Sequence, residues 1–335
     1  MRYYAITITP KAQPSQAERT QELKTGVPLP ASGKDGKPIT ITSLKPDGKV
    51  NLNSLNVELD IPLATFNDPE GFANVKIYGI SIEDIMQAAD LNGGLIEISG
   101  GMSKGLPLAN PDQAGVLLVG TVYQAFGNWI GDQMTLDLIV QITDNTVNNF
   151  VVNWKAGSEL KTMVQNVLTQ NYPGYQLKFN VRQAMTLTAD ETGAYQSIYQ
   201  FAFFVKRISQ HIIKDYAYPG VDISVLGKTF LINDGTTKDK PKQIQFIDLI
   251  GQPTWLNYKT IQFKCPMRAD LHFGDFVSLP EGAVKLSGKS FSQLKKGVTF
   301  QGTFQIQRVR HVGNFRQADA GSWCTVIDAL QVETQ

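Results

Sequence analysis

The sequence is poor in charge and carries no dense cluster of basic residues. Charged residues make up 18% of the 335 positions, and the formal net charge is +1 at pH 7. Affinity for nucleic acid comes largely from clustered Lys and Arg. Here the basic residues are scattered or lie in short turns, such as the one with Lys238, Lys240 and Lys242. This composition argues against a protein that binds phosphates over a broad surface.

Long apolar segments and cysteines are also scarce. The most apolar run is centred on residues 116–119 and is far shorter than the ~20 residues needed to cross a bilayer. The first nine residues alternate like a strand and lack the apolar core and cleavage site of a secretory signal. We therefore expect a soluble protein, made in the cytoplasm and without membrane contact. Cys265 and Cys324 lie in separate predicted strands, which indicates buried, reduced thiols.

A chain of this length is long enough for two or three folded units. Residues 75–140 predict the central part of the first: a strand at 75–80, a helix capped by Ser81, a strand at 95–99, and paired strands at 116–126 and 134–143. The apolar helix face comprises Ile82, Ile85, Met86 and Ala89. A unit of this order can fold as a β-barrel with one helical plug. Residues 100–115, rich in Pro and Gly, are expected to project from it as a contact loop.

The chain before this unit begins with a strand that ends at Pro10, since proline donates no amide to a ladder. Residues 11–48 are polar and interrupted by Pro and Gly, with a possible short helix at 15–24. So long an insertion is either an arm that contacts a partner or a tolerated surface loop. Strand-like composition resumes over residues 52–66.

The pattern changes after residue 150. Ser158 is expected to cap a helix whose apolar residues are spaced from Leu160 to Leu168 and which stops before Pro173. Residues 176–181 and 200–208 predict strands, so residues 151–218 are interpreted as a small α/β unit. Further strands are predicted at 224–233, 243–249, 260–265, 276–279, 299–310 and 323–330.

The predicted fold class is therefore mainly β, with two barrel-like β units flanking a small α/β unit. The expected boundaries are 1–150, 151–218 and 219–335. Closing many short strands on themselves removes exposed sheet edges.

Two motifs suggest catalysis but lack the required context. Gly101-Met-Ser103-Lys-Gly105 matches a hydrolase nucleophile elbow, yet Pro107 and Pro111 oppose the helix that must follow the serine. Residues 282–290 end in Gly-Lys-Ser like a phosphate-binding loop, but five residues rather than four separate Gly282 from Gly288. A basic hairpin is the preferred interpretation of this segment.

Metal and acid–base chemistry have similarly weak support. Cys265, His272, His311 and Cys324 are zinc-ligand types, but no pair has the short spacing of a structural site. The carboxylates of Glu97, Asp132, Asp137 and Asp275 are interpreted as turn or strand-face residues. We predict no catalytic, cofactor or metal site, and no enzyme.

Several segments, in this order, resemble the baseplate hub proteins of tailed bacteriophages, including those of Mu-like and other contractile-tailed phages. They are residues 120–140, 154–158, 172–174, 248–255, 268–275 and 309–316, followed by Trp323. The resemblance runs from about Val75 to the end of the chain, while residues 11–50 match nothing in that family.

The resemblance implies a homotrimeric ring in the virion tail baseplate, with two barrel-like units per subunit around a channel. Such a ring joins a six-fold tail tube, or a distal tail protein, to a three-fold central spike. The tape measure protein would end inside the channel, and DNA would only pass through it. Two alternatives are another tail component, such as a tube-end adaptor or distal tail protein, and a tail-associated cell-wall hydrolase.

Overall fold

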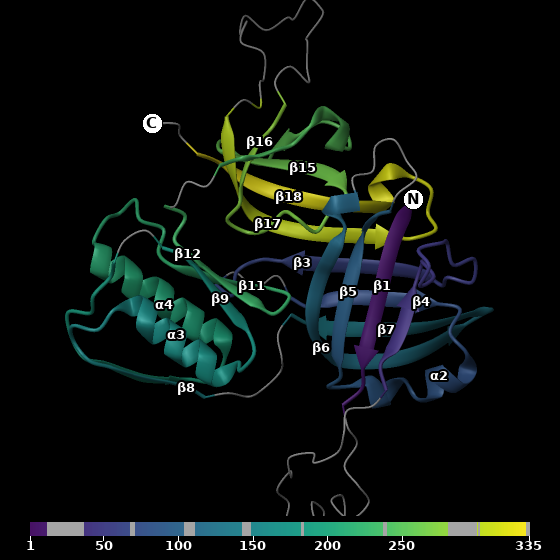
Figure 1. Ribbon diagram of the computed structural model, residues 1–335, viewed down its shortest axis with the longest axis horizontal. Coiled ribbons are helices and arrows are strands. Elements are labelled where there is room, and N and C mark those ends of the chain that lie inside the picture. Colours follow the sequence, from purple (N-terminus) through teal and green to yellow (C-terminus); the bar gives the residue numbers. More distant parts are fainter. Residues whose placement is uncertain are drawn as a thin grey trace, which may run out of the picture.

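The computed structural model describes residues 1–11, 37–67, 71–103, 111–142, 149–181, 184–236, 240–280, 300 and 302–332. Within them, a large antiparallel sheet occupies one side of the molecule and a helical unit lies beside it (Figure 1). The expected fold class, mainly β with an α/β part in the middle, is confirmed.

Thirteen strands belong to the large sheet. Its main path runs β14-β15-β18-β17-β3-β4-β7-β6-β5-β1-β2, and β16, which pairs with β17, also pairs with β13. The N-terminal strands are β1 (Arg2–Thr9), β2 (Ile39–Thr42), β3 (Asn56–Leu63), β4 (Ala73–Tyr78), β5 (Leu95–Met102), β6 (Gly115–Ile130) and β7 (Gln133–Gln141). The C-terminal strands are β13 (Lys242–Gln243), β14 (Thr254–Trp255), β15 (Thr260–Pro266), β16 (Phe276–Ser278), β17 (Thr303–Asn314) and β18 (Trp323–Val332).

The two β-rich parts share this sheet through one antiparallel pair. On β17, Val309 lies opposite Leu63 of β3, and Asn314 lies opposite Glu58. The path has an end at β14 and another at β2, so the pairings among the described strands close no barrel. The arrangement is a continuous sheet where two separate closed units were expected.

The opening strand is confirmed, because β1 ends at Thr9, directly before Pro10. Part of the segment expected as a polar arm is a strand, since β2 pairs with β1 and places Ile39 opposite Ile8. The possible helix at 15–24 lies outside the described residues.

The helix capped by Ser81 is present, but it is not a plug. It is α2 (Ile82–Met86), and the Ser81 hydroxyl accepts a hydrogen bond from the Asp84 amide at 3.2 Å. None of its residues is buried, and Met86 is 81% exposed. Ala88 and Leu91, in the 3-10 turn that follows, face the core instead of Met86 and Ala89. The helix therefore lies on the surface of the sheet.

The helical unit contains two helices, α3 (Leu160–Asn171) and α4 (Ile198–Ile213), and two small sheets. One sheet is the antiparallel pair of β8 (Phe150–Trp154) and β10 (Glu191–Tyr195). The other has three strands, β9 (Gln176–Asn180), β11 (Asp222–Leu226) and β12 (Thr229–Asn233). The α3 helix is confirmed, but its N-cap is Glu159 with no side-chain hydrogen bond, rather than Ser158.

Two strand predictions in and beside this unit were wrong. Residues 200–208 belong to α4, whose start is capped by the Ser197 hydroxyl at 3.3 Å from the Gln200 amide. Residues 224–233, expected as one strand, form the β11–β12 hairpin around Gly227, and β12 pairs with β9 in parallel.

One residue of the sheet's β3–β4 connection is buried in the helical unit. The Phe66 ring contacts Tyr199 of α4, at 5.4 Å between ring centroids, and Phe230 of β12 at 6.2 Å. Beside it, Asn67 donates to Asp222 at 2.8 Å, and the same carboxylate pairs with Lys206 at 2.9 Å. This anchor couples the helical unit to the large sheet.

In the C-terminal part, four of the five strands expected after residue 233 are present as β15, β16, β17 and β18. The fifth, at 243–249, is only the two-residue β13 followed by a 3-10 turn at Phe246–Asp248. Cys265 and Cys324 are buried free thiols, as expected. No helix among the described residues is long and apolar enough to cross a membrane.

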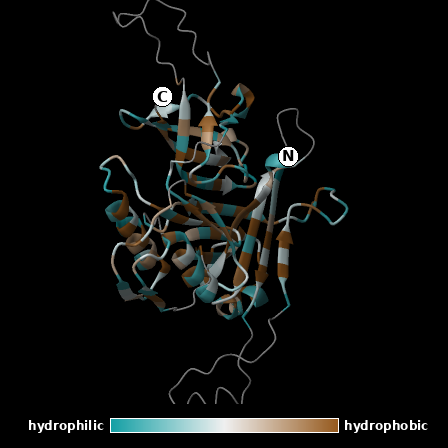
Figure 2. Ribbon diagram, turned by 60° about the vertical axis from the view of Figure 1, so that its left-hand side comes forward, coloured by the Kyte–Doolittle hydropathy of each residue, from teal (hydrophilic) through white to brown (hydrophobic). Residues whose placement is uncertain are grey.

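Three hydrophobic clusters hold these parts together. One lies inside the N-terminal strands and includes Met267 and Trp323 from the C-terminal part; the second surrounds α3 and α4; the third lies within the C-terminal strands. Hydrophobic and hydrophilic residues alternate along many strands (Figure 2). This alternation places one face of each strand against a cluster and leaves the other toward water.

Candidate interaction surfaces

Ser103 lies just after β5, at the edge of the described chain. Its hydroxyl donates to the main-chain carbonyl of Met1 at 3.2 Å, so the hydrogen bond goes to backbone rather than to a histidine base.

The loop expected to project from residues 100–115 is described only at its ends. Those ends contact the protein's own C-terminal part: the Trp323 indole donates to Gly101 O at 3.0 Å, and the Ala269 amide donates to Gln113 O at 2.7 Å. The segment 282–290 lies outside the described residues.

The residues considered for zinc do not gather around one point. Thr325 of β18 lies between Cys265 of β15 and His311 of β17 in the strand register. Cys324 precedes Thr325 on β18 and therefore points to the other face of the sheet. His272 Nε2 donates to the Ala269 carbonyl, 2.9 Å away, and Nδ1 lies 3.3 Å from Asp275 Oδ2. Among the described residues, no group of three or more metal-ligating side chains is present.

Instead, His311, Thr325 and Cys265 form a buried polar row across β17, β18 and β15. The Thr325 hydroxyl donates to the Arg268 carbonyl at 3.2 Å, so its oxygen accepts from the Arg268 amide at 3.0 Å and from His311 Nδ1 at 2.9 Å. Burial lowers the pKa of His311 to about 3, with a smaller contribution from His272, and burial raises the pKa of the Cys265 thiol to about 12. Both groups are neutral at pH 7, which suits a structural row rather than a reactive site.

Arg268 closes this row with a buried ion cluster. Its guanidinium, 4% exposed, lies 2.6 Å from Asp270 and 3.6 Å from Asp248. Burial alone would lower its pKa, but the hydrogen bond and charge of Asp270 outweigh burial, and the pKa is raised. The cluster fixes the turn that carries Met267 into the N-terminal hydrophobic cluster.

The four carboxylates considered for acid–base chemistry occupy different positions: Glu97 lies opposite Val119 of β6, whereas Asp137 lies opposite Phe126, seven positions further along that strand. Glu97 is on β5, while Asp137 on β7 pairs with Lys76 at 3.1 Å and accepts from Asn128 and Thr135. Asp275 pairs with Lys242 at 2.7 Å; burial raises its pKa, but hydrogen bonds from His272 and Lys242 outweigh burial and lower it. Asp132 is exposed in the β6–β7 turn. Each therefore has a structural setting of its own.

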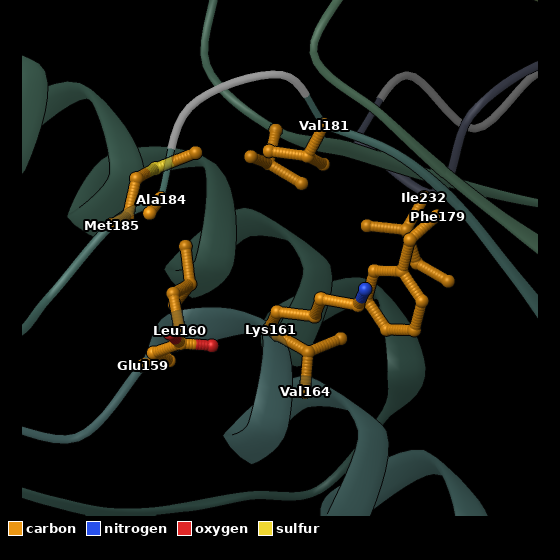
Figure 3. Close-up of a pocket in the computed structure, with 10 residues that line it drawn as sticks. Glu159, Leu160, Lys161, Val164, Phe179, Val181, Ala184, Met185 and Ile232 are labelled. Atoms are coloured by element: carbon orange, nitrogen blue, oxygen red, sulfur yellow. The ribbon is translucent and has the colours of Figure 1, made fainter.

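A cavity of about 230 Å³ lies beside the start of α3 (Figure 3). Its walls are apolar and include Leu160, Val164 and Met185, while Glu159 and Lys161 are the charged residues that line it. The Lys161 ammonium lies 5.4 Å from the centre of the Phe179 ring, a cation–π contact that Figure 3 displays.

A larger groove of about 550 Å³ follows the outer face of α4. It is lined by aromatic side chains, one aliphatic side chain and polar or charged side chains of both signs: Tyr195, Phe203, Phe204, Ile208, Gln200, Arg207, His211 and Glu191. Phe203 is 55% exposed, and the Arg207 guanidinium lies 5.9 Å from its ring. An exposed aromatic ring with an adjacent guanidinium is typical of protein interaction surfaces.

A projecting apolar surface is formed by α2 and the tip of the β6–β7 hairpin; we call it the hairpin patch. It comprises Ile82, Met86 and Trp129, whose exposed fractions are 42%, 81% and 65%. A Cβ on Gly127 would lie only 2.3 Å from Ile85, so α2 packs directly on the hairpin backbone. Trp129 is two positions along the strand and therefore points to the same side as α2.

Comparison of the sequence with protein-family models and with curated proteins gives no match. Solved structures do share the fold. The 43 kDa tail protein of prophage MuSo2 from Shewanella oneidensis aligns with a TM-score of 0.51 and 8% identity, covering 85% of this chain and 94% of that one. The tail protein from Neisseria meningitidis MC58 aligns with a TM-score of 0.50 and 7% identity, covering 98% and 96%. The chain has the fold of these two tail proteins.

Sequence reasoning missed both exposed surfaces. The α4 groove was hidden because its helix was interpreted as a strand, although Phe201, Ala202, Val205 and Ile208 follow helical spacing and Ser197 precedes them as a cap. The hairpin patch was hidden because α2 was expected inside a barrel. The sequence feature that indicates its position is Gly127, because a residue without a side chain lets α2 pack closely against the outside of the hairpin.

Proposed function

We propose that this protein is a structural component of a phage tail, and more specifically a baseplate hub that assembles as a homotrimeric ring. The observation that carries the proposal is the fold shared with two tail proteins over almost their whole length. The resemblance of the C-terminal segments to hub proteins supports the finer role. The ring would join the tail tube, or a distal tail protein, to a central spike, and the tape measure protein would end in its channel.

The architecture suits a rigid building block rather than an enzyme. Strand pairing from β14 to β2 makes one mechanical unit of the N- and C-terminal parts, and Phe66 anchors the helical unit to it. The near-neutral formal charge of +1 fits a conduit through which DNA passes without being held, because strong phosphate neutralisation would retain it. We accordingly place the protein in the virion tail baseplate, after synthesis in the host cytoplasm, and assign it no catalytic activity.

The division at 1–150, 151–218 and 219–335 stays a prediction. The helical unit's hydrophobic cluster starts in sequence with Phe66 and then runs from Phe150 to Ile232, and β12 pairs with β9. We therefore favour a middle unit that extends to Asn233. Removing residues 151–233 as one block should therefore break fewer contacts with the rest of the protein than removing residues 151–218.

The mass of the purified full-length chain tests the ring. Light scattering coupled to size-exclusion chromatography should give three times the 37.0 kDa chain mass for the protein alone, or that mass plus the mass of the spike when the trimer forms on a spike protein. A monomer at every concentration and with every tail partner would refute the hub role. Cleavage of peptidoglycan by the purified protein would favour the hydrolase alternative instead.

A further inference from the structure

We propose that the hairpin patch of one subunit inserts into the α4 groove of the next subunit, and that this contact closes the ring. The inference rests on the proposed trimer and names the two surfaces that would form its interface. It draws on three properties of these surfaces: their shape, their charge and their positions in the molecule.

The two surfaces are complementary in shape and polarity. The hairpin patch ends in Trp129, which is more than half exposed. The α4 groove is a hollow of about 550 Å³ with Phe203 and Phe204 among its walls. Tryptophan side chains buried in desolvated pockets are enriched among the residues that contribute most to binding between proteins, and aromatic pairs add to this.

Arg207 of the groove can pair with acidic residues beside the hairpin patch. Exposed acidic residues surround the hairpin patch: Glu83 and Asp84 on α2, and Asp132 in the hairpin turn. The groove carries Arg207 and His211, with Glu191 as its acidic member. Arg207 is held over Phe203, which orients its guanidinium in the groove where it can pair with an incoming carboxylate.

Their positions exclude a contact within one subunit. In Figure 1 the hairpin tip and α2 lie at the right of the molecule, whereas α4 lies at the left, along its longest axis. A contact between different surfaces of identical subunits is heterologous, and it closes into a ring when each step rotates by one third of a turn.

Disulfide trapping tests the contact in the full-length protein. The double variant Trp129→Cys/Phe203→Cys, oxidised with glutathione disulfide, should give covalent dimers and trimers on a non-reducing gel. The native thiols do not interfere, because Cys265 and Cys324 are 0% and 2% exposed. The matched control is Trp129→Cys/Tyr258→Cys: Tyr258 is 89% exposed but lies in the C-terminal part, and it should give monomers only.

Charge reversal provides a second measurement that does not depend on thiols. Arg207→Glu should raise the dissociation constant of the oligomer about tenfold, because a glutamate would face the acids of the hairpin patch. Adding Asp132→Arg should restore most of the affinity. Lys264→Glu, an exposed reversal on β15, should leave it unchanged and serves as the control. Far-ultraviolet circular dichroism confirms that each variant is folded.

The outcomes separate this contact from the proposed function. A trimer whose double-cysteine variant gives no more cross-linking than the control would overturn the contact and leave the ring intact. A strictly monomeric wild-type protein would overturn both. Selective cross-linking together with rescue of Arg207→Glu by Asp132→Arg would support the contact.

Discussion

His311, Thr325 and Cys265 occupy adjacent positions on three neighbouring strands, in the sheet interior where apolar side chains are usual. Their hydrogen bonds are mutual or go to the Arg268 backbone, so the row costs little as long as it stays intact. Since each partner is fixed by strand register, the row also penalises any slip between β17 and β18.

The protonation of His311 should make the protein sensitive to acid. Its folded pKa of about 3 is below the usual 6.5, so the unfolded chain binds the proton first as the pH falls. The free energy of unfolding is therefore unaffected by this group above pH 6.5, and it falls by about 1.4 kcal/mol per pH unit between pH 6.5 and pH 3. His311→Asn keeps a group that hydrogen-bonds to Thr325 and should flatten this part of the curve. Urea unfolding at several pH values from 7 to 4 gives the free energy of unfolding of the wild type and of the variant. The same dependence on pH in both proteins would disprove the role of His311.

The two arginine ion pairs should differ sharply in their contribution to stability. Arg268→Ala removes a buried cation and leaves Asp248 and Asp270 unpaired, which should cost about 3 kcal/mol. Arg310→Ala breaks an equally short pair with Asp60, but that pair is exposed and should contribute about 0–1 kcal/mol. Denaturation followed by tryptophan fluorescence compares them, and equal losses would contradict the assigned role of burial.

Individual strands and helices differ in how well the sequence predicts them. The strands with strict alternation, such as β1 and β15, and the cap of α2 at Ser81, follow from local chemistry. The α4 helix does not, because Phe201, Phe203 and Val205 alternate like a strand while Phe201, Val205 and Ile208 fit a helix. Its 16 residues without a break exceed the usual length of a strand and were the better guide.

Long-range pairing was beyond local patterns. The β17–β3 ladder joins positions about 250 residues apart in sequence, and neither strand carries a signal for its partner. Because this ladder joins the N-terminal and C-terminal strands, they form one sheet instead of the two barrels expected from the sequence. The surfaces proposed to act in assembly depend on such packing, so neither followed from the sequence.

Gly127 should control the position of α2. Gly127→Ala places a methyl group against Ile85 and should displace the helix, at a cost of about 1–3 kcal/mol, with faster amide hydrogen exchange in residues 82–86. Gly131→Ala is the control: it carries backbone strain at φ 64° but has no atom within 4 Å of the new methyl group. Faster exchange in α2 in the control as well would argue against the steric explanation.

At the scale of the whole molecule, Phe66 should determine whether the helical unit and the sheet unfold together. Phe66→Ala empties its place between Tyr199 and Phe230 and should cost about 3–5 kcal/mol. Calorimetry should show a single transition in the wild type and two in the variant, because the main anchor between the parts is lost. Val151→Ala, at an exposed strand position, should leave the single transition intact.

The ring itself is the central claim, and the number of copies around the tail axis tests it most directly. Cryo-electron microscopy of assembled tails should reveal three copies of this chain between the six-fold tube and the three-fold spike. In each, the hairpin patch should face α4 of a neighbour. Six copies, or a location away from the tail axis, would contradict the account.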